Sequence, residues 1–117
     1  QPVRIVLDGR ARVPKEATVL TDGGTTMHLT GDVDVERLLQ QLGDQEMQRL
    51  LVEGGPSTVE RFLRAGLVDE LMVVHSTVEH TSPVPFGLAE ADFTAAGLTQ
   101  RQGTTWGEER VDVWLRD

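Results

Sequence analysis

The stretch LLVEGGPS at residues 50–57 decides the fold prediction. Residues 49–52 are predicted to form a short buried strand, two glycines follow it, and a helical pattern begins just after Pro56. Free amide groups at a helix start, beside glycines that allow close backbone approach, form an anion site suited to phosphate. An ordinary strand-to-helix turn uses glycines in the same way, so the glycine pair by itself favours that simpler interpretation.

Short apolar runs rich in β-branched residues predict further strands on both sides of this stretch. They cover residues 3–7, 17–21, 26–30, 70–75, 98–102 and 110–116. Alternation of strands with helical segments of about ten residues predicts parallel pairing. The last two strands are separated only by a turn, so they should pair antiparallel. We therefore expect one α/β domain over residues 1–117, with a mixed, mostly parallel sheet flanked by helices.

Two helices are predicted from the spacing of apolar residues. The first carries four apolar side chains at i, i+3, i+4 and i+7, namely Val35, Leu38, Leu39 and Leu42. Asp34 lies near its start and Gly43 supplies a stop at its end. In the second helix, Ser57 and Glu60 have the spacing of a capping box, and Gly66 ends the helix.

The charge balance narrows the class of ligand. Eleven basic residues against nineteen acidic ones give a formal net charge of −8. This argues against a nucleic-acid or membrane partner, since both require a positive field. The absence of cysteine excludes disulfides and thiolate metal sites. No apolar stretch is long enough to cross a bilayer and no leader precedes the first strand, so we expect a cytoplasmic protein.

Histidine and tryptophan positions give no metal or stacking site. His75, Glu79 and His80 match the spacing of no common metal centre, so no metal is expected. His28 is isolated in the sequence and is assigned to surface or packing. Trp114 lies within an alternating strand whose neighbours are apolar, which favours a packing or subunit-contact role over stacking on a cofactor.

Residues 51–57 (LVEGGPS), the helix after them and residues 65–71 (AGLVDEL) resemble the C-terminal reductase domain of the bifunctional riboflavin-biosynthesis deaminase/reductase. The opening VRIVLDGR at residues 3–10 resembles the same family's strand and loop at the equivalent distance upstream. The resemblance implies a dihydrofolate-reductase-like domain that is incomplete at its N-terminus. It also implies a homodimer, because a half-domain leaves a sheet edge open.

The resemblance further implies a site. The glutamate of the Glu-Gly-Gly motif faces the substrate, which assigns substrate binding to Glu53. The glycine pair and the helix start hold the NADPH diphosphate, which assigns cofactor binding to Gly54, Gly55, Pro56, Ser57 and Thr58. In the related dihydrofolate reductases the glycine pair is joined by a cis peptide. No side chain is predicted to be catalytic, because the cofactor carries the chemistry.

A second cofactor segment follows the first strand, in the loop that lies near the adenosine 2′-phosphate in this superfamily. This places Gly9 and Arg10 there, with Arg10 as the partner of the phosphate. Asp8 would repel that phosphate if its carboxylate pointed inward.

The activity that the resemblance implies is NADPH-dependent reduction of the ribosyl group of a phosphorylated aminopyrimidine. It would be that of a 5-amino-6-(5-phosphoribosylamino)uracil reductase. Residues 76–83 depart from the family pattern, so a related reductase with a different substrate stays open. The sequence is also compatible with a non-catalytic nucleotide-binding or dimerisation module, and with a stable fragment that has no activity of its own.

Overall fold

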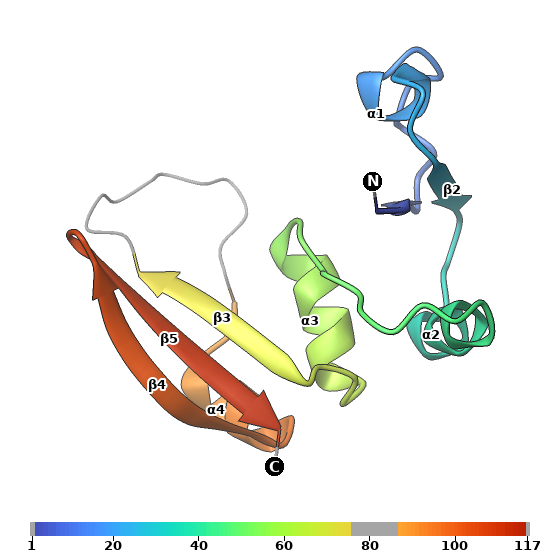
Figure 1. Ribbon diagram of the computed structural model, residues 1–117. Helices are drawn as coiled ribbons and strands as arrows, with labels where there is room; N and C mark the ends of the chain where they lie inside the picture. The colour runs from blue at the N-terminus through green and yellow to red at the C-terminus, as the bar shows by residue number, and fades with distance from the viewer. Residues whose placement is uncertain (1, 76–86, 117) are drawn as a thin grey trace. The chain divides into compact units, whose positions relative to one another are not determined.

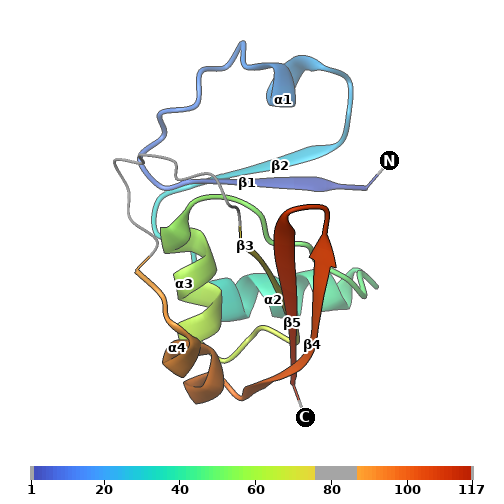
Figure 2. The ribbon, with the colours of Figure 1, turned by 90° about the vertical axis from the view of Figure 1, so that its left-hand side faces the viewer.

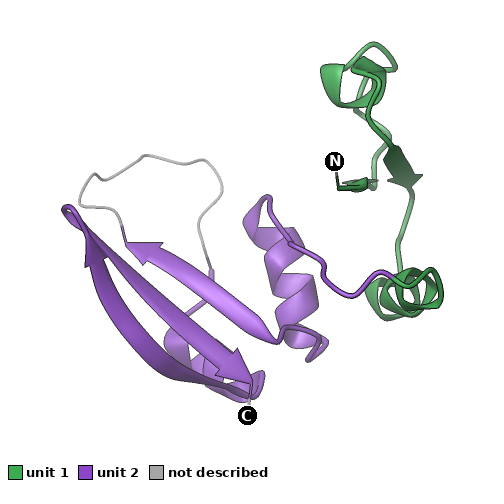
Figure 3. Cartoon of the chain, viewed as in Figure 1, with its two compact units in different colours: residues 1–46 green, residues 47–117 purple. Residues whose placement is uncertain are grey.

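The computed structural model describes residues 2–75 and 87–116, and the chain forms two compact units. Unit 1 comprises residues 1–46 and unit 2 comprises residues 47–117; Figure 3 shows them in green and purple. Within the described residues, no helix has both the length and the apolar character needed to span a membrane. The single domain over residues 1–117 stays a prediction.

Unit 1 contains a pair of parallel strands, as predicted. β1 (Arg4–Asp8) and β2 (Thr26–Thr30) lie side by side (Figure 2). The connection between them carries α1 (Thr18–Thr21), where the sequence predicted a strand over residues 17–21. That prediction was wrong because a run of so few apolar residues carries no readable period. The chain closes into a helical turn in which the Thr21 hydroxyl donates to the Ala17 carbonyl at 3.1 Å.

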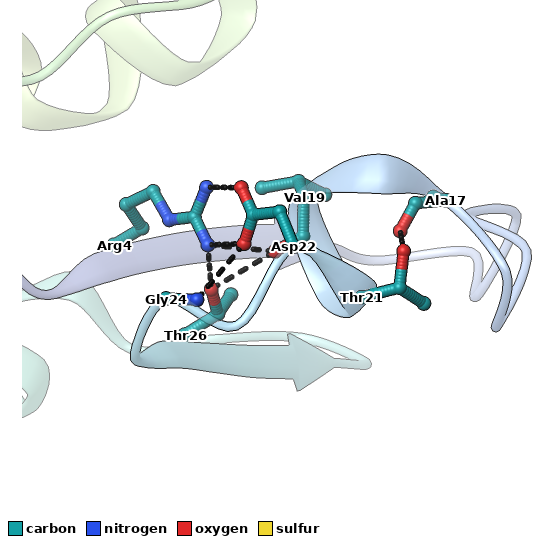
Figure 4. A network of polar contacts seen from close by, with 7 residues as sticks. All are labelled: Arg4, Ala17, Val19, Thr21, Asp22, Gly24 and Thr26. Carbon is teal, nitrogen blue, oxygen red and sulfur yellow. Dashed lines mark hydrogen bonds and ion pairs between the residues drawn. The ribbon is translucent and has the colours of Figure 1, made fainter.

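A polar network ties the two strands to the short helix between them (Figure 4). The Arg4 guanidinium on β1 donates to the two carboxylate oxygens of Asp22 at 2.5 and 2.6 Å. It also donates to the hydroxyl of Thr26 on β2 at 2.9 Å and to the Val19 carbonyl at 3.0 Å. The hydrogen bond from Arg4 lowers the pKa of Asp22 to about 2. The network therefore depends on an ionised carboxylate.

The helix α2 (Val35–Asp44) begins where the sequence predicted and ends later. The Asp34 carboxylate accepts hydrogen bonds from two backbone amides of the first turn, so it is the N-cap. Gly43 was predicted to stop the helix but lies inside it. The helix ends at Asp44 with Gln45 as its C-cap. Glu46 takes the left-handed conformation, with φ of +65°, that a glycine after the helix would have supplied. Three apolar side chains of α2 are buried: Val35, Leu38 and Leu42.

Unit 2 begins with a segment that the sequence assigned incorrectly. Residues 49–52 were predicted to form a buried strand, but they pair with no strand among the described residues, and Leu51 is 80% exposed. An apolar run becomes a strand only when a neighbouring strand satisfies its amide and carbonyl groups. No such neighbour is found in the described sheets.

The helix α3 (Pro56–Arg64) follows this segment. It begins at Pro56, with Gly55 as its N-cap and no side-chain capping bond. The predicted capping box from Ser57 to Glu60 is therefore wrong, because the helix begins with proline at its first position and its N-cap lies two residues earlier than predicted. The Glu60 carboxylate instead accepts a hydrogen bond from the guanidinium of Arg64, one turn further along the helix, at 2.6 Å. Gly66 ends the helix as predicted, with φ of +71°.

The sheet of unit 2 is antiparallel throughout. Its strands are β3 (Glu70–His75), β4 (Leu98–Trp106) and β5 (Glu109–Arg116), with β5 in the centre (Figure 1). The described strands thus form one parallel pair in unit 1 and two antiparallel pairs in unit 2. The prediction of a mixed α/β chain is confirmed. The prediction of a mostly parallel sheet was wrong, because β3 pairs with the C-terminal hairpin rather than with an earlier strand.

One face of this sheet carries the core of unit 2. Trp114 on the central strand meets the ring of Phe93 edge-on, with ring centroids 5.3 Å apart. Phe93 belongs to α4 (Glu90–Ala95), a short helix that the sequence did not reveal. The buried cluster consists of Leu63, Leu88, Phe93, Leu98 and Trp114. Both α3 and α4 therefore pack on the same face, and the predicted packing role of Trp114 is confirmed.

Candidate functional site

The predicted diphosphate segment is an exposed turn that leads into α3. Gly54 and Gly55 are both exposed, and a Cβ added to either would meet no atom within 4 Å. Gly54 has φ of +138°, which side-chain-bearing residues rarely adopt, whereas Gly55 has an ordinary extended φ of −71°. The described peptide bonds include no cis bond, unlike the expectation for this pair. The backbone here is open to a ligand.

The first turn of α3 leaves hydrogen-bond donors available. Pro56 has no amide hydrogen, and the amides of Thr58 and Val59 both point to the Gly55 carbonyl, at 3.2 and 3.4 Å. Within the described residues the Ser57 amide has no such partner, and no side chain caps the helix. An uncapped helix start has a partial positive charge and donors directed outward. Residues 54–58 therefore fit a phosphate group.

Glu53 lies immediately before this turn. Its side chain is exposed and has no hydrogen bond or ion pair with the described part of the chain. A purely structural Glu53 carboxylate would cap a backbone amide or pair with an arginine. It forms neither interaction with a described residue. The carboxylate is therefore free to meet a ligand.

The predicted 2′-phosphate segment lies in unit 1, directly after β1. Gly9 and Arg10 are exposed, and the Arg10 guanidinium forms no hydrogen bond or ion pair with a described residue. Asp8, at the end of the strand, is 8% exposed. Its carboxylate accepts from the backbone amides of Arg12 at 2.8 Å and Val13 at 3.0 Å. The expected repulsion is thus reduced, because the carboxylate is directed into its own loop.

The sequence suggested that His28 is isolated, but in the structure it bonds Asp8. Its Nε2 lies 2.8 Å from the second oxygen of Asp8, across the β1–β2 pair. The hydrogen bond from His28 is the main cause that lowers the pKa of Asp8, and the amides of Arg12 and Val13 act in the same direction against burial. Asp8 is therefore a buried carboxylate with three hydrogen bonds.

A similar arrangement occurs in unit 2. The Asp112 side chain on β5 is 1% exposed, and its carboxylate meets His75 Nε2 at 2.9 Å and Arg110 Nε at 3.0 Å. Burial raises the pKa of Asp112, but the hydrogen bonds from Arg110 and His75 outweigh it and the net direction is downward. Glu79 and His80, which the sequence weighed together with His75, lie outside the described residues.

The chain was compared with known protein families. The family model described as the RibD C-terminal domain matches residues 1–78. The chain belongs to the RibD C-terminal domain family. This confirms the resemblance on which the site assignments rest. Among curated proteins, no match was found.

A solved structure shares the fold of this RibD C-terminal domain chain. It is the Acinetobacter baumannii RibD, form 2, with a TM-score of 0.75 and 22% sequence identity. The match covers 97% of the present chain and 37% of the Acinetobacter chain. At this identity the likeness establishes a common fold, and the chain spans little more than a third of the protein that it matches.

In this member of the RibD C-terminal domain family, the predicted residues fall into two groups. Glu53 and residues 54–58 are consecutive in unit 2, whereas Gly9 and Arg10 belong to unit 1. Sequence reasoning missed two features of the loop after β1: the backbone bonds of Asp8 and the presence of a second exposed guanidinium at Arg12. The Asp-Gly pair after an apolar strand signals a turn, but it does not reveal where the carboxylate points.

Proposed function

We propose that this chain is the cofactor-binding part of an NADPH-dependent reductase of riboflavin biosynthesis. Its substrate would be a phosphorylated aminopyrimidine of the 5-amino-6-(5-phosphoribosylamino)uracil type, reduced at the ribosyl group. The observation that carries the proposal is the uncapped, exposed start of α3 directly behind Glu53 and the glycine pair, in a member of this family. A helix start of this kind favours a diphosphate.

The chain's own residues would bind and orient the reactants. Residues 54–58 would hold the diphosphate, with the Ser57 amide as a donor that the helix leaves unused. Arg10 with Gly9 would meet the 2′-phosphate. Glu53 would face the substrate, where an exposed carboxylate without a protein partner accepts hydrogen bonds from hydroxyl groups. Bound NADPH supplies the hydride, so the protein contributes by alignment and by excluding water.

The proposal extends to partners and location. The net charge of −8 disfavours nucleic acid or an anionic membrane as a partner. A small phosphorylated ligand is compatible with this charge, because hydrogen-bond donors at its own binding site hold it. We propose a cytoplasmic homodimer, supported by two apolar side chains on β3, Met72 and Val74, that are 51% and 49% exposed. A non-catalytic nucleotide-binding module would use the same helix start and would differ in showing no turnover.

Nucleotide titration tests the assignment of the helix start. We expect the full chain to bind NADPH in calorimetry and Gly55→Ala to abolish most of that binding, because the added methyl group would occupy space reserved for the diphosphate. The methyl group meets no protein atom within 4 Å and the backbone is extended, so the variant should still fold, with a loss of at most about 1 kcal/mol at the N-cap. Gly43→Ala is the matched control, since it adds the same group at an open, exposed position of α2. Undiminished NADPH binding by Gly55→Ala would overturn the assignment.

Turnover tests the role of Glu53 and the choice between enzyme and binding module. In an assembly that oxidises NADPH with the aminopyrimidine phosphate, Glu53→Gln should lower kcat/KM and leave NADPH affinity near normal. Unchanged turnover in the variant would contradict the substrate role. NADPH binding without any turnover on this substrate class would favour the module.

A further inference from the structure

We propose that Asp8 is a positioning residue for the loop after β1, and that Arg12 joins Arg10 in selecting a nucleotide with a 2′-phosphate. The inference deepens the proposed function and rests on it. Neither residue was assigned a role by the sequence, which placed only Gly9 and Arg10 at this phosphate. The hydrogen bonds that shape residues 9–13 are the starting point.

Backbone amides of the loop donate hydrogen bonds to Asp8 and hold the loop against that residue. The Ala11 amide donates to the Asp8 carbonyl at 3.0 Å, and the amides of Arg12 and Val13 donate to the Asp8 carboxylate. Ala11 has φ of +51°, a left-handed conformation that is uncommon for a residue with a side chain. Such a conformation persists only when neighbouring bonds enforce it. The three bonds to Asp8 supply that enforcement.

These bonds determine which groups of the loop remain for a ligand. Three successive amides, those of Ala11, Arg12 and Val13, are used within the loop and cannot donate to a phosphate. Beyond the backbone of Gly9 and Arg10, phosphate recognition at this loop therefore depends on side chains. The side chains of Arg10 and Arg12 are exposed, form no hydrogen bond or ion pair with a described residue, and offer several donors each.

The two arginines are close enough to share one phosphate. Only Ala11 lies between them in the sequence. Their Cα atoms are therefore at most about 7.6 Å apart, which is within the reach of two arginine side chains. Lys15 adds a third cation, and residues 10–15 contain no acidic residue in a chain whose net charge is −8. A dianionic phosphate would find here a local positive charge that the molecule as a whole does not offer.

His28 completes the arrangement from the neighbouring strand. Its Nε2 lies 2.8 Å from the second oxygen of Asp8, which also serves Val13. The carboxylate is thereby held in the orientation that shapes the loop. Asp8 acts through the loop and not by contact with the nucleotide.

The test compares NADPH with NADH on the full chain by calorimetric titration. We expect Arg12→Ala to weaken NADPH binding about tenfold, as for the loss of one charge-assisted hydrogen bond, and to leave NADH affinity unchanged. Arg12→Lys should restore part of the loss because it keeps the charge. Asp8→Asn should reduce the preference for NADPH about three- to tenfold, because the loop must then be ordered on binding.

Two features make the outcomes separable. Arg37→Ala removes an exposed arginine from α2 of the same unit and should leave both affinities unchanged. Arg12 is exposed, so its variants report on the ligand even if Asp8→Asn fails to fold. Wild-type protein that binds NADPH and NADH equally would overturn the proposed function and the inference together. A wild-type preference for NADPH that survives Arg12→Ala and Asp8→Asn would overturn the inference alone.

Discussion

Each of the two units buries one aspartate and joins it to a histidine on the adjacent strand. Asp8 meets His28 at 2.8 Å in unit 1, and Asp112 meets His75 at 2.9 Å in unit 2. The remaining bonds differ. Asp8 accepts from backbone amides of an exposed loop, whereas Asp112 accepts from the Arg110 guanidinium on its own strand. The same pair of side chains thus fixes the shape of a loop in one unit and links strands in the other.

The surroundings of the two aspartates explain the difference. Asp112 shares a strand with Trp114, which belongs to the buried cluster between the sheet and two helices. Asp8 ends a strand, and the residue after it is exposed. The Asp112 carboxylate bonds side chains within the sheet, so we expect it to act on stability. The Asp8 carboxylate lies at a strand end, so we expect it also to determine how a loop meets a ligand. We expect variants in the two units to separate these effects.

The largest effect should come from the core beside Asp112. Trp114→Ala is expected to lower the free energy of unfolding by about 3–5 kcal/mol, because it leaves a cavity against Phe93 in the helix–sheet core. Urea denaturation followed by circular dichroism measures it. Trp106→Ala is the matched control, since that side chain is 58% exposed and its loss should cost less than about 1 kcal/mol. Similar costs for the two variants would contradict the placement of the core.

The next effect separates the two aspartates directly. Asp112→Asn should lower the urea midpoint more than Asp8→Asn, because it deprives both Arg110 and His75 of a carboxylate that is 1% exposed. It should nevertheless leave the ratio of NADPH to NADH affinity unchanged. Asp8→Asn should show the reverse ranking. If both variants alter the ratio equally, the two aspartates do not differ in their effect on the ligand.

The elements that the sequence predicted well have local causes. The start of α2 follows from the Asp34 side chain, and the end of α3 follows from Gly66, whose φ of +71° suits glycine. The strand β3 and the final hairpin were also predicted, since alternation and a turn at residues 106–109 are visible within a few residues. These features need no knowledge of distant parts of the chain.

The features that the sequence missed depend on distant partners. Residues 49–52 have the composition of a buried strand, yet only pairing with another strand would make them one. The bonds of Asp8 to His28 and of Asp112 to His75 span 20 and 37 residues. No local pattern indicates such contacts, so His28 looked isolated. In the candidate site, the residues of the glycine turn were placed from their motif, whereas the shape of the loop after β1 required the structure.

A smaller effect should distinguish the two glycines before α3, where backbone conformation rather than a buried carboxylate determines the shape of the turn. Gly54→Ala forces a side chain into φ of +138° and should cost about 1–3 kcal/mol of stability. Gly55→Ala should cost less, up to about 1 kcal/mol for alanine at the N-cap, because its φ is −71° and the space around it is open. Urea midpoints for both variants measure this. A stable Gly54→Ala chain would show that backbone conformation does not shape this turn.

The smallest effect should appear at low pH in the network around Arg4, where the carboxylate is more exposed than in either buried pair. The pKa of Asp22 is about 2, below its ordinary value near 4, because Arg4 bonds the ionised form. The folded state therefore binds the Asp22 proton less readily than the unfolded state. The resulting stabilisation is complete above about pH 4 and is lost as the pH falls from about 4 to about 2. The difference in stability between wild type and Asp22→Asn should shrink over that interval.

The control is a double-mutant cycle with Arg4→Gln, in which the Asp22→Asn difference should disappear. The cycle isolates this pair from Asp8 and Asp112, whose pKa values are also lowered. A difference that stays constant down to about pH 2 would show that the pair contributes nothing through its charge.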